Sequence, residues 1–233
     1  MNNKKTIITA SLFAAVAVSV QAATTILIDY DDGTAGNGIH DAAINNGGFE
    51  ATTGVSPNLV LVDWVAVGDK DLQVLSNLNS PIGGNNTLIG RENGFLSPGQ
   101  NTGHVLALGD QFSGSYGWRD AFGWAAGETI DATLYYTTDN LIGGARTSLF
   151  TFNSGNEAAN NTWETETLAL TAGVTDAGAV GKTLFIAFEG NNLSDGSFAR
   201  FDNVYLDVTT VPEPSTTALL GLAGLALILR RRK

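Results

Sequence analysis

The chain has 233 residues, with 23 acidic and 12 basic side chains and a formal net charge of −11. Both ends are basic, so residues 23–209 keep 22 acidic and 6 basic side chains and a charge near −16. Such an acidic domain argues against nucleic acid and anionic lipid as partners. The chain contains no cysteine, which excludes disulfide bonds and thiol chemistry.

Residues 1–22 have the pattern of a secretory signal peptide. Lys4 and Lys5 precede an apolar stretch over residues 7–20, and the small-residue site that ends at Ala22 predicts cleavage before Ala23. The alternative is an uncleaved membrane anchor. The sequence therefore predicts an exported protein.

From residue 24 the pattern becomes that of short strands separated by turns. Residues 128–136 show it best, because Ile130, Ala132, Leu134 and Tyr136 alternate with residues on the other face. Further strands are predicted over residues 25–30, 48–51, 59–67, 104–108, 147–152, 165–170, 184–189 and 201–208. No stretch between residues 24 and 209 sustains helical periodicity. We therefore expect an all-β antiparallel sandwich of the jelly-roll type over residues 23–209.

Four neighbouring residues form the candidate ligand-binding site: Tyr116, Trp118, Asp120 and Trp124. If residues 118–124 are extended, Trp118, Asp120 and Trp124 share one face. Aromatic rings beside polar groups offer flat apolar contact and hydrogen bonds, which suits a sugar. The alternative is that these rings fill the core, where aromatic side chains contribute most.

Recognisable catalytic motifs are absent. His40 and His104 lie in separate contexts, and no phosphate loop or nucleophile elbow occurs. Glu164 and Glu166 would share a face of a strand, and glycosidic hydrolysis needs two carboxylates. The alternative is a pair of solvated carboxylates on an outer face. We predict no catalytic residue and no enzyme activity.

The last 23 residues consist of three consecutive parts. Residues 211–215 contain two prolines, which prevent a strand or helix from continuing. Residues 216–229 are uncharged and mostly apolar, and they predict a single transmembrane helix that is shorter than the roughly 20 residues usually needed. Residues 230–233 are all basic, so they extend the span by snorkelling and stay on the cytoplasmic side. The alternative is a C-terminal core helix.

This tail resembles the PEP-CTERM sorting signal of Gram-negative bacteria, and we assign the signal to residues 210–233. The residues that carry the resemblance are Val211, Pro212, Glu213, Pro214 and Ser215, then the apolar run, then Arg230, Arg231 and Arg232. It implies that an exosortase-type enzyme processes the protein near the Pro-Glu-Pro motif. It also implies a transient stage in the inner membrane, followed by release to the cell surface or extracellular matrix.

A second resemblance concerns the domain. Residues 181–189 and 201–208 look like the last two strands of galactose-binding-like jelly rolls, which are common among carbohydrate-binding modules. Residues 46–50 resemble the early segment of these folds. The resemblance implies a structural Ca²⁺ where the early segment meets the last strand, with Glu50 and Asp202 as ligands. Each of these follows a phenylalanine that should face inward.

The sequence thus predicts an exported surface or matrix protein with a carbohydrate-binding-like domain. Two other functions stay open: an enzyme acting on extracellular polysaccharide, such as a glycoside hydrolase or lyase, and a purely structural matrix protein. The expected partners are an exosortase, an extracellular polysaccharide and, transiently, the inner membrane, with no nucleic acid.

Overall fold

The computed structural model describes nine stretches of the chain: residues 22–31, 43–53, 60–66, 73–76, 86–91, 98–122, 127–154, 162–191 and 198–211. Residues 1–21 and 212–233 lie outside them, so the signal peptide and the transmembrane helix stay predictions. Within the described stretches, no helix is long and apolar enough to cross a membrane.

Strands make up nearly all of the regular structure in these stretches. In chain order they are β1 (Ala23–Ile28), β2 (Thr52–Thr53), β3 (Val60–Leu61), β4 (Trp64–Ala66), β5 (Gln73–Ser76), β6 (Asn86–Arg91), β7 (Pro98–Val105), β8 (Gln111–Phe122), β9 (Thr129–Thr137), β10 (Arg146–Asn153), β11 (Trp163–Leu170), β12 (Thr183–Asn191) and β13 (Phe198–Thr210). One short 3₁₀ helix, η1 (Ala177–Ala179), precedes β12.

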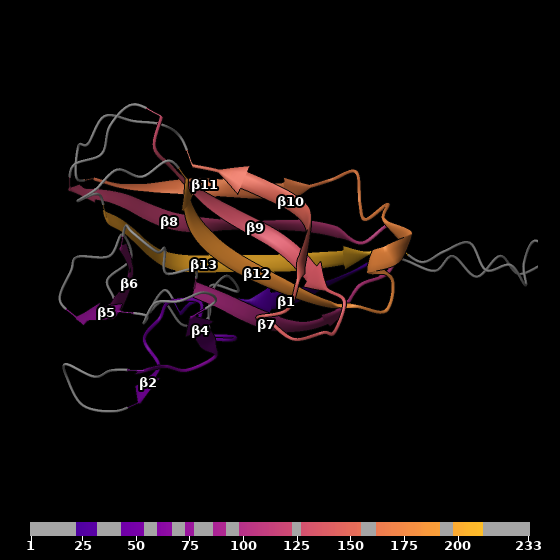
Figure 1. Ribbon diagram of the computed structural model, residues 1–233, viewed down its shortest axis with the longest axis horizontal. Coiled ribbons are helices and arrows are strands. Elements are labelled where there is room, and N and C mark those ends of the chain that lie inside the picture. Colours follow the sequence, from indigo (N-terminus) through magenta and orange to yellow (C-terminus); the bar gives the residue numbers. More distant parts are fainter. Residues whose placement is uncertain are drawn as a thin grey trace, which may run out of the picture. The chain divides into compact units, whose positions relative to one another are not determined.

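The strands form two antiparallel sheets that pack face to face (Figure 1). The order in the six-stranded sheet is β11-β8-β13-β6-β5, and β1 pairs with the second half of β13. The order in the five-stranded sheet is β10-β9-β12-β7-β4, while β2 and β3 pair with each other. This arrangement confirms the predicted antiparallel sandwich.

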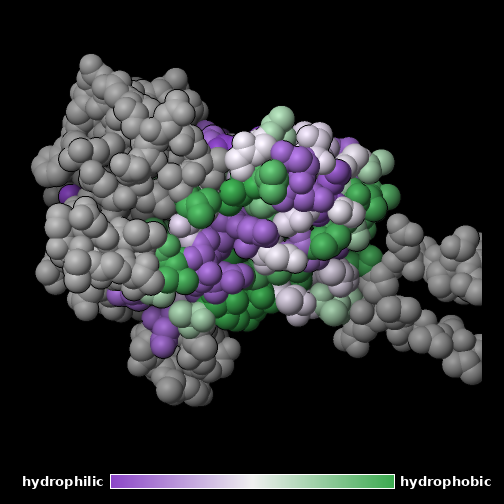
Figure 2. Space-filling model, turned by 60° about the horizontal axis from the view of Figure 1, so that its bottom comes forward, coloured by the Kyte–Doolittle hydropathy of each residue, from purple (hydrophilic) through white to green (hydrophobic). Residues whose placement is uncertain are grey.

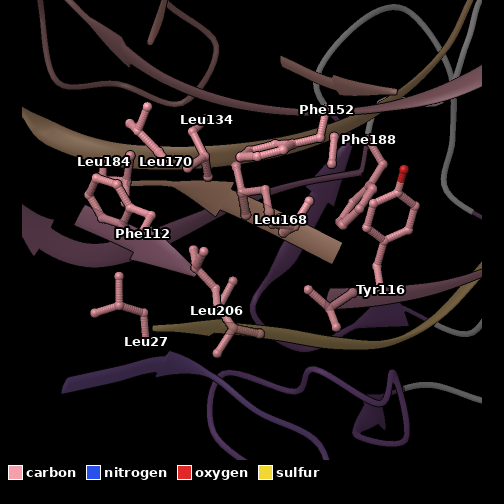
Figure 3. Close-up of a cluster of buried hydrophobic side chains, with 14 of the residues drawn as sticks. Leu27, Phe112, Tyr116, Leu134, Phe152, Leu168, Leu170, Leu184, Phe188 and Leu206 are labelled. Carbon is pink, nitrogen blue, oxygen red and sulfur yellow. The ribbon is translucent and has the colours of Figure 1, made fainter. Parts of the chain in front are cut away.

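The core lies between the two sheets and follows the alternation of the strands. Ile130, Ala132, Leu134 and Tyr136 of β9 all enter it, as their spacing predicts. Figure 3 shows Leu134 in a cluster that also contains Phe112, Phe152, Leu168, Leu184 and Phe188. Full burial of such a side chain stabilises the fold by about 1.5–3 kcal/mol.

Three predicted strands are wrong in detail. The strand predicted over residues 104–108 is instead the end of β7, which stops at Val105. The apolar run over residues 59–67 is not one strand, because Asp63 takes a left-handed conformation (φ 69°) and separates β3 from β4. Residues 48–51 do not form a strand either, since Phe49 also has a positive φ of 57°. The side chain of Phe49 is nevertheless fully buried. A local turn can therefore place an apolar side chain in the core without a strand.

The turn at residues 45–49 connects the beginning of the domain to its last strand. The backbone N–H of Gly47 donates to the Asp29 carbonyl at 2.9 Å, and the Val204 N–H donates to the Gly47 carbonyl at 2.9 Å. The indole N–H of Trp64 donates to the Asn46 carbonyl at 3.0 Å. The turn is thus held between β1 and the middle of β13.

Candidate functional site

The residues predicted to stack against a sugar lie on β8 and point into the sandwich. The Tyr116 side chain is 0% exposed and that of Trp118 is 1% exposed. The Tyr116 hydroxyl donates to the Ile130 carbonyl at 3.2 Å, and its ring packs edge-on against Phe188 (Figure 3). The prediction of a ligand platform at Tyr116 and Trp118 is therefore wrong, because their face of β8 turns toward the other sheet.

The side chains of the other two residues of that predicted site lie outside the described structure. Asp120 lies near the end of β8, and its side chain is not among those described. Trp124 lies outside the described residues. Their part in ligand binding stays a prediction.

Glu164 and Glu166 share one face of β11, as predicted. They lie opposite Trp118 and Tyr116 in the register with β8, so they point to the same side as these core residues. The pair therefore lies at the margin of the core and not on the outer face. Burial, with smaller contributions from Glu166 and Asp131, raises the pKa of Tyr116 well above its usual value.

The structure brings together the two segments expected to hold calcium. Phe49 and Phe201 both face inward with fully buried side chains, as predicted. Asp202 is 1% exposed and its Oδ1 accepts from the Asn203 N–H at 2.8 Å, whereas Glu50 is exposed. Both are oxygen donors, which suit Ca²⁺, and the Gly47–Val204 hydrogen bond joins their segments.

Further calcium ligands would have to come from carbonyl groups and water. Among the described residues, no group of three or more Asp, Glu, His or Cys side chains could hold a metal ion. Calcium usually takes six to eight oxygen ligands. A calcium held by Glu50 and Asp202 therefore stays a prediction.

The outward surface of the five-stranded sheet offers a different site, which we call the β9–β12 face. Tyr135 of β9 and Phe185 of β12 lie opposite each other, with stacked rings 5.4 Å apart at an interplanar angle of 28°. Together with Ala187 and Ile142 they form a second apolar cluster apart from the main core. These side chains project from the sheet on the side away from the core.

An arginine covers this aromatic pair. Arg146, the first residue of β10, places its guanidinium carbon 4.9 Å from the centre of the Tyr135 ring and forms an ion pair with Glu189 of β12. The Tyr135 hydroxyl donates to the Ile142 carbonyl at 3.0 Å. Burial raises the pKa of Tyr135 to about 12, although the positive charge of Arg146 opposes this shift. Arg146 and Ile142 thus cover rings that face away from the core.

Polar side chains continue the same face along β9 and β10. The Asn153 amide donates to Asp131 Oδ1 at 2.6 Å, and the Thr133 and Thr151 hydroxyl oxygens lie 3.2 Å apart. Asn101 of β7 is exposed opposite Phe185. The face therefore presents amide, hydroxyl and carboxylate groups around a covered aromatic pair. Such a set can exchange hydrogen bonds with a hydroxyl-rich ligand.

Residues 210–233 match the family model of the PEP-CTERM protein-sorting motif. The chain carries a PEP-CTERM sorting signal. This signal implies processing by an exosortase and export to the cell surface through a membrane-anchored intermediate. No curated protein matches the chain.

Two solved structures are similar to the domain of this chain. The CBM22-1 xylan-binding domain of Xyn10C from Paenibacillus barcinonensis has a TM-score of 0.51 at 14% sequence identity, over 82% of this chain and 99% of that one. The Stig cyclase Fisc from Fischerella sp. TAU has a TM-score of 0.47 at 15% identity, over 72% and 96%. The first likeness shows that the domain has the jelly-roll fold that carbohydrate-binding modules also have.

Sequence reasoning missed the β9–β12 face, although one signal was present. Residues 184–188 are an uninterrupted apolar run, and such a run is typical of a strand covered on both faces. In the structure, Leu184 and Ile186 enter the core while Phe185 and Ala187 form the outer cluster. That Tyr135 lies beside Phe185 depends on the pairing of β9 with β12, which no local pattern encodes.

Proposed function

We propose that this protein is an exported surface or matrix protein that binds a neutral extracellular polysaccharide on the β9–β12 face. The observation that carries the proposal is the stacked pair of Tyr135 and Phe185 on the outside of a sheet, beneath Arg146. The sorting signal supports the location. The fold of a xylan-binding domain supports the ligand class.

The chemistry of the face favours a neutral, hydroxyl-rich chain. Arg146, Asn101 and Asn153 can donate hydrogen bonds to sugar oxygens, and Asp131 and Glu189 can accept them from sugar hydroxyls. Tyr135 and Phe185 are 0% and 1% exposed in the structure, so a sugar can contact the Tyr135 ring with its C–H face only after Arg146 and Ile142 have moved aside. The charge near −16 over residues 23–209 opposes strongly anionic polymers.

The proposal assigns the two ends of the chain to delivery. Residues 1–22 direct export and are removed, and residues 216–229 hold the protein in the inner membrane until the exosortase acts near Pro212 and Pro214. The basic residues 230–233 keep the end of the tail on the cytoplasmic side. Binding of polysaccharide then retains the released domain in the matrix.

Affinity electrophoresis and calorimetry against xylan, mixed-linkage glucan, mannan and the anionic polymer alginate test the binding. We expect at least one neutral polymer to bind, and Arg146→Ala and Glu189→Gln to weaken that binding about tenfold or more. Thr167→Ala is the control, because Thr167 is exposed on β11 of the other sheet.

Three outcomes would contradict the proposal in different ways. Wild-type affinity in both face variants would place the binding site elsewhere. Release of new reducing ends from a bound polymer would identify an enzyme. The absence of binding to every polymer would favour a purely structural matrix protein.

A further inference from the structure

The end of the sandwich at which β13 finishes forms a surface that the proposed polysaccharide site does not use. We call it the tail-proximal end, and it comprises residues 105–110, 138–145, 171–182 and Val211. The end of β13 and the loop with η1 both lie at the right-hand end of Figure 1. The sorting signal, residues 210–233, begins at this end of the domain.

Backbone and side-chain hydrogen bonds tie these loops into one unit. The Leu106 N–H donates to the Lys182 carbonyl at 2.8 Å, and the Gly181 N–H donates back to the Leu106 carbonyl at 2.9 Å. The Lys182 ammonium donates to the Thr138 carbonyl at 2.7 Å. The loops therefore present their side chains from a fixed framework.

Exposed apolar side chains are frequent at this end. Five of the exposed large hydrophobic residues lie here: Val105 (59% exposed), Leu108 (38%), Leu141 (64%), Val180 (48%) and Val211 (44%). Figure 2 shows hydrophobic side chains at the right-hand end of the described part, and others near its middle and lower edge.

Charge is sparse on the same surface. The three loops contain Asp110, Asp139, Asp176 and Lys182 as their charged residues. Asp110 is buried and its Oδ2 lies 2.8 Å from His104 Nε2, so it adds no exposed carboxylate. The charges that reach the surface at this end are therefore one lysine and two exposed carboxylates. This end is thus much less negative than the domain as a whole.

Chain length places this end next to the membrane before the tail is cleaved. The predicted apolar span begins at residue 216, five residues after Val211. Five residues extend at most about 17 Å, and the headgroup layer takes up roughly 5–8 Å of that distance. A short tether gives a high effective concentration of lipid at the tail-proximal end.

We infer that the tail-proximal end rests on the lipid surface while the tail is uncleaved, with Leu108 and Val180 in the headgroup region. This inference rests on the proposed anchoring by residues 216–229. A few half-exposed aliphatic side chains are too little to hold an acidic domain on a membrane alone. The contact therefore orients the anchored domain and is lost when cleavage removes the tether.

Site-directed fluorescence tests the inference, and the cysteine-free chain supplies a clean background. Leu108→Cys, Val180→Cys and Thr165→Cys are each labelled with bimane in the full chain, which is reconstituted in phosphatidylcholine vesicles containing a doxyl-lipid quencher. Thr165 is the control, because it is exposed on β11 and lies five residues, or about 17 Å of strand, from the end at Leu170.

We expect quenching at positions 108 and 180 to exceed that at position 165 at least twofold. Equal and weak quenching at all three positions, in protein that floats with the vesicles, would overturn the inference and leave the anchoring intact. Failure of the full chain to float with the vesicles would overturn the anchoring, and the inference with it.

Discussion

The backbone N–H of Val204 donates a hydrogen bond to the carbonyl oxygen of Gly47 at 2.9 Å, which joins the turn after β1 to the middle of β13. A β-carbon at position 47 would lie 2.3 Å from the Val204 oxygen and 2.4 Å from the Asp29 oxygen. Both oxygens belong to residues whose backbone is held by hydrogen bonds, so moving either of them would cost free energy. The turn therefore depends on glycine.

We expect Gly47→Ala to lower the free energy of unfolding by about 2–3 kcal/mol, which is typical of overpacking a tight site. Urea denaturation followed by tryptophan fluorescence measures this. Gly143→Ala is the matched control, because a β-carbon there meets no atom within 4 Å. If the two variants unfold at the same urea concentration, the close approach at Gly47 does not exist in solution.

Trp118→Ala should act on stability. Its side chain is almost fully buried, and removing such a ring costs about 3–5 kcal/mol. Tyr116→Phe should cost about 1 kcal/mol, since it removes only the hydrogen bond to the Ile130 carbonyl. Polysaccharide affinity per folded molecule should stay unchanged in both variants. If the Trp118→Ala protein is as stable as the wild type but no longer binds polysaccharide, Trp118 stacks against the ligand and is not a core residue.

Alkaline pH should destabilise the fold through two tyrosines. Burial raises the pKa of Tyr135 and of Tyr205 from 10.0 to about 12. The folded protein holds these protons more tightly than the unfolded chain, so this contribution is fully present below pH 10 and is lost as the pH rises from about 10 to about 12.

Ultraviolet absorbance of tyrosinate, together with urea denaturation at each pH, measures the effect. Tyr135→Phe should flatten the decline in unfolding free energy across this range. Titration of both tyrosines near pH 10 in the folded protein would show that their burial is absent in solution.

Calcium should raise the melting temperature if Glu50 and Asp202 hold it, because an ion that binds only the folded state stabilises that state. Millimolar Ca²⁺ should shift melting upward, a chelator should reverse the shift, and Asp202→Ala should abolish it. Asp139→Asn is the control, because Asp139 is exposed in the loop after β9. The protein must first be shown by elemental analysis to contain no metal. If neither calcium nor chelator then changes its melting temperature, Glu50 and Asp202 do not hold calcium.

The tail should be absent from mature protein. Mass spectrometry of material released by the native host should show loss of the residues after about Pro214. Replacing Arg230, Arg231 and Arg232 with Glu should misplace the protein, because the charge that keeps the end cytoplasmic is reversed. Recovery of an intact basic end on released protein would contradict the proposed processing.

The strands that could be predicted were those with clear alternation. The spacing within β9 indicated both its existence and its inward face. β8 was not predicted as a whole, since glycine, serine and charged residues interrupt its apolar positions. It is a strand because it pairs along its length with β11 and β13. Pairing with strands distant in sequence, and not local propensity, therefore determines that residues 111–122 form a strand.

The candidate site was less predictable than the fold. In β8, alternation showed which residues share a face of the strand, but it could not show which face turns inward. For that reason Trp118 had two interpretations until its neighbours across the sheet were known. The β9–β12 face combines Tyr135, Phe185 and Arg146 from three strands, and only the register between those strands brings them together. The tail was predictable because all its parts are consecutive in sequence.

The position of β13 has a consequence for the order of events during export. This strand pairs with β8 along its length and with β6 and β1 on its other side, yet it is the last strand before the sorting signal. The six-stranded sheet cannot close until β13 is available for pairing. Pairing between such distant segments is also slow, because a long loop must close first. If the tail anchors the protein as proposed, a chain that is exported unfolded completes this sheet while the tail still holds it at the membrane.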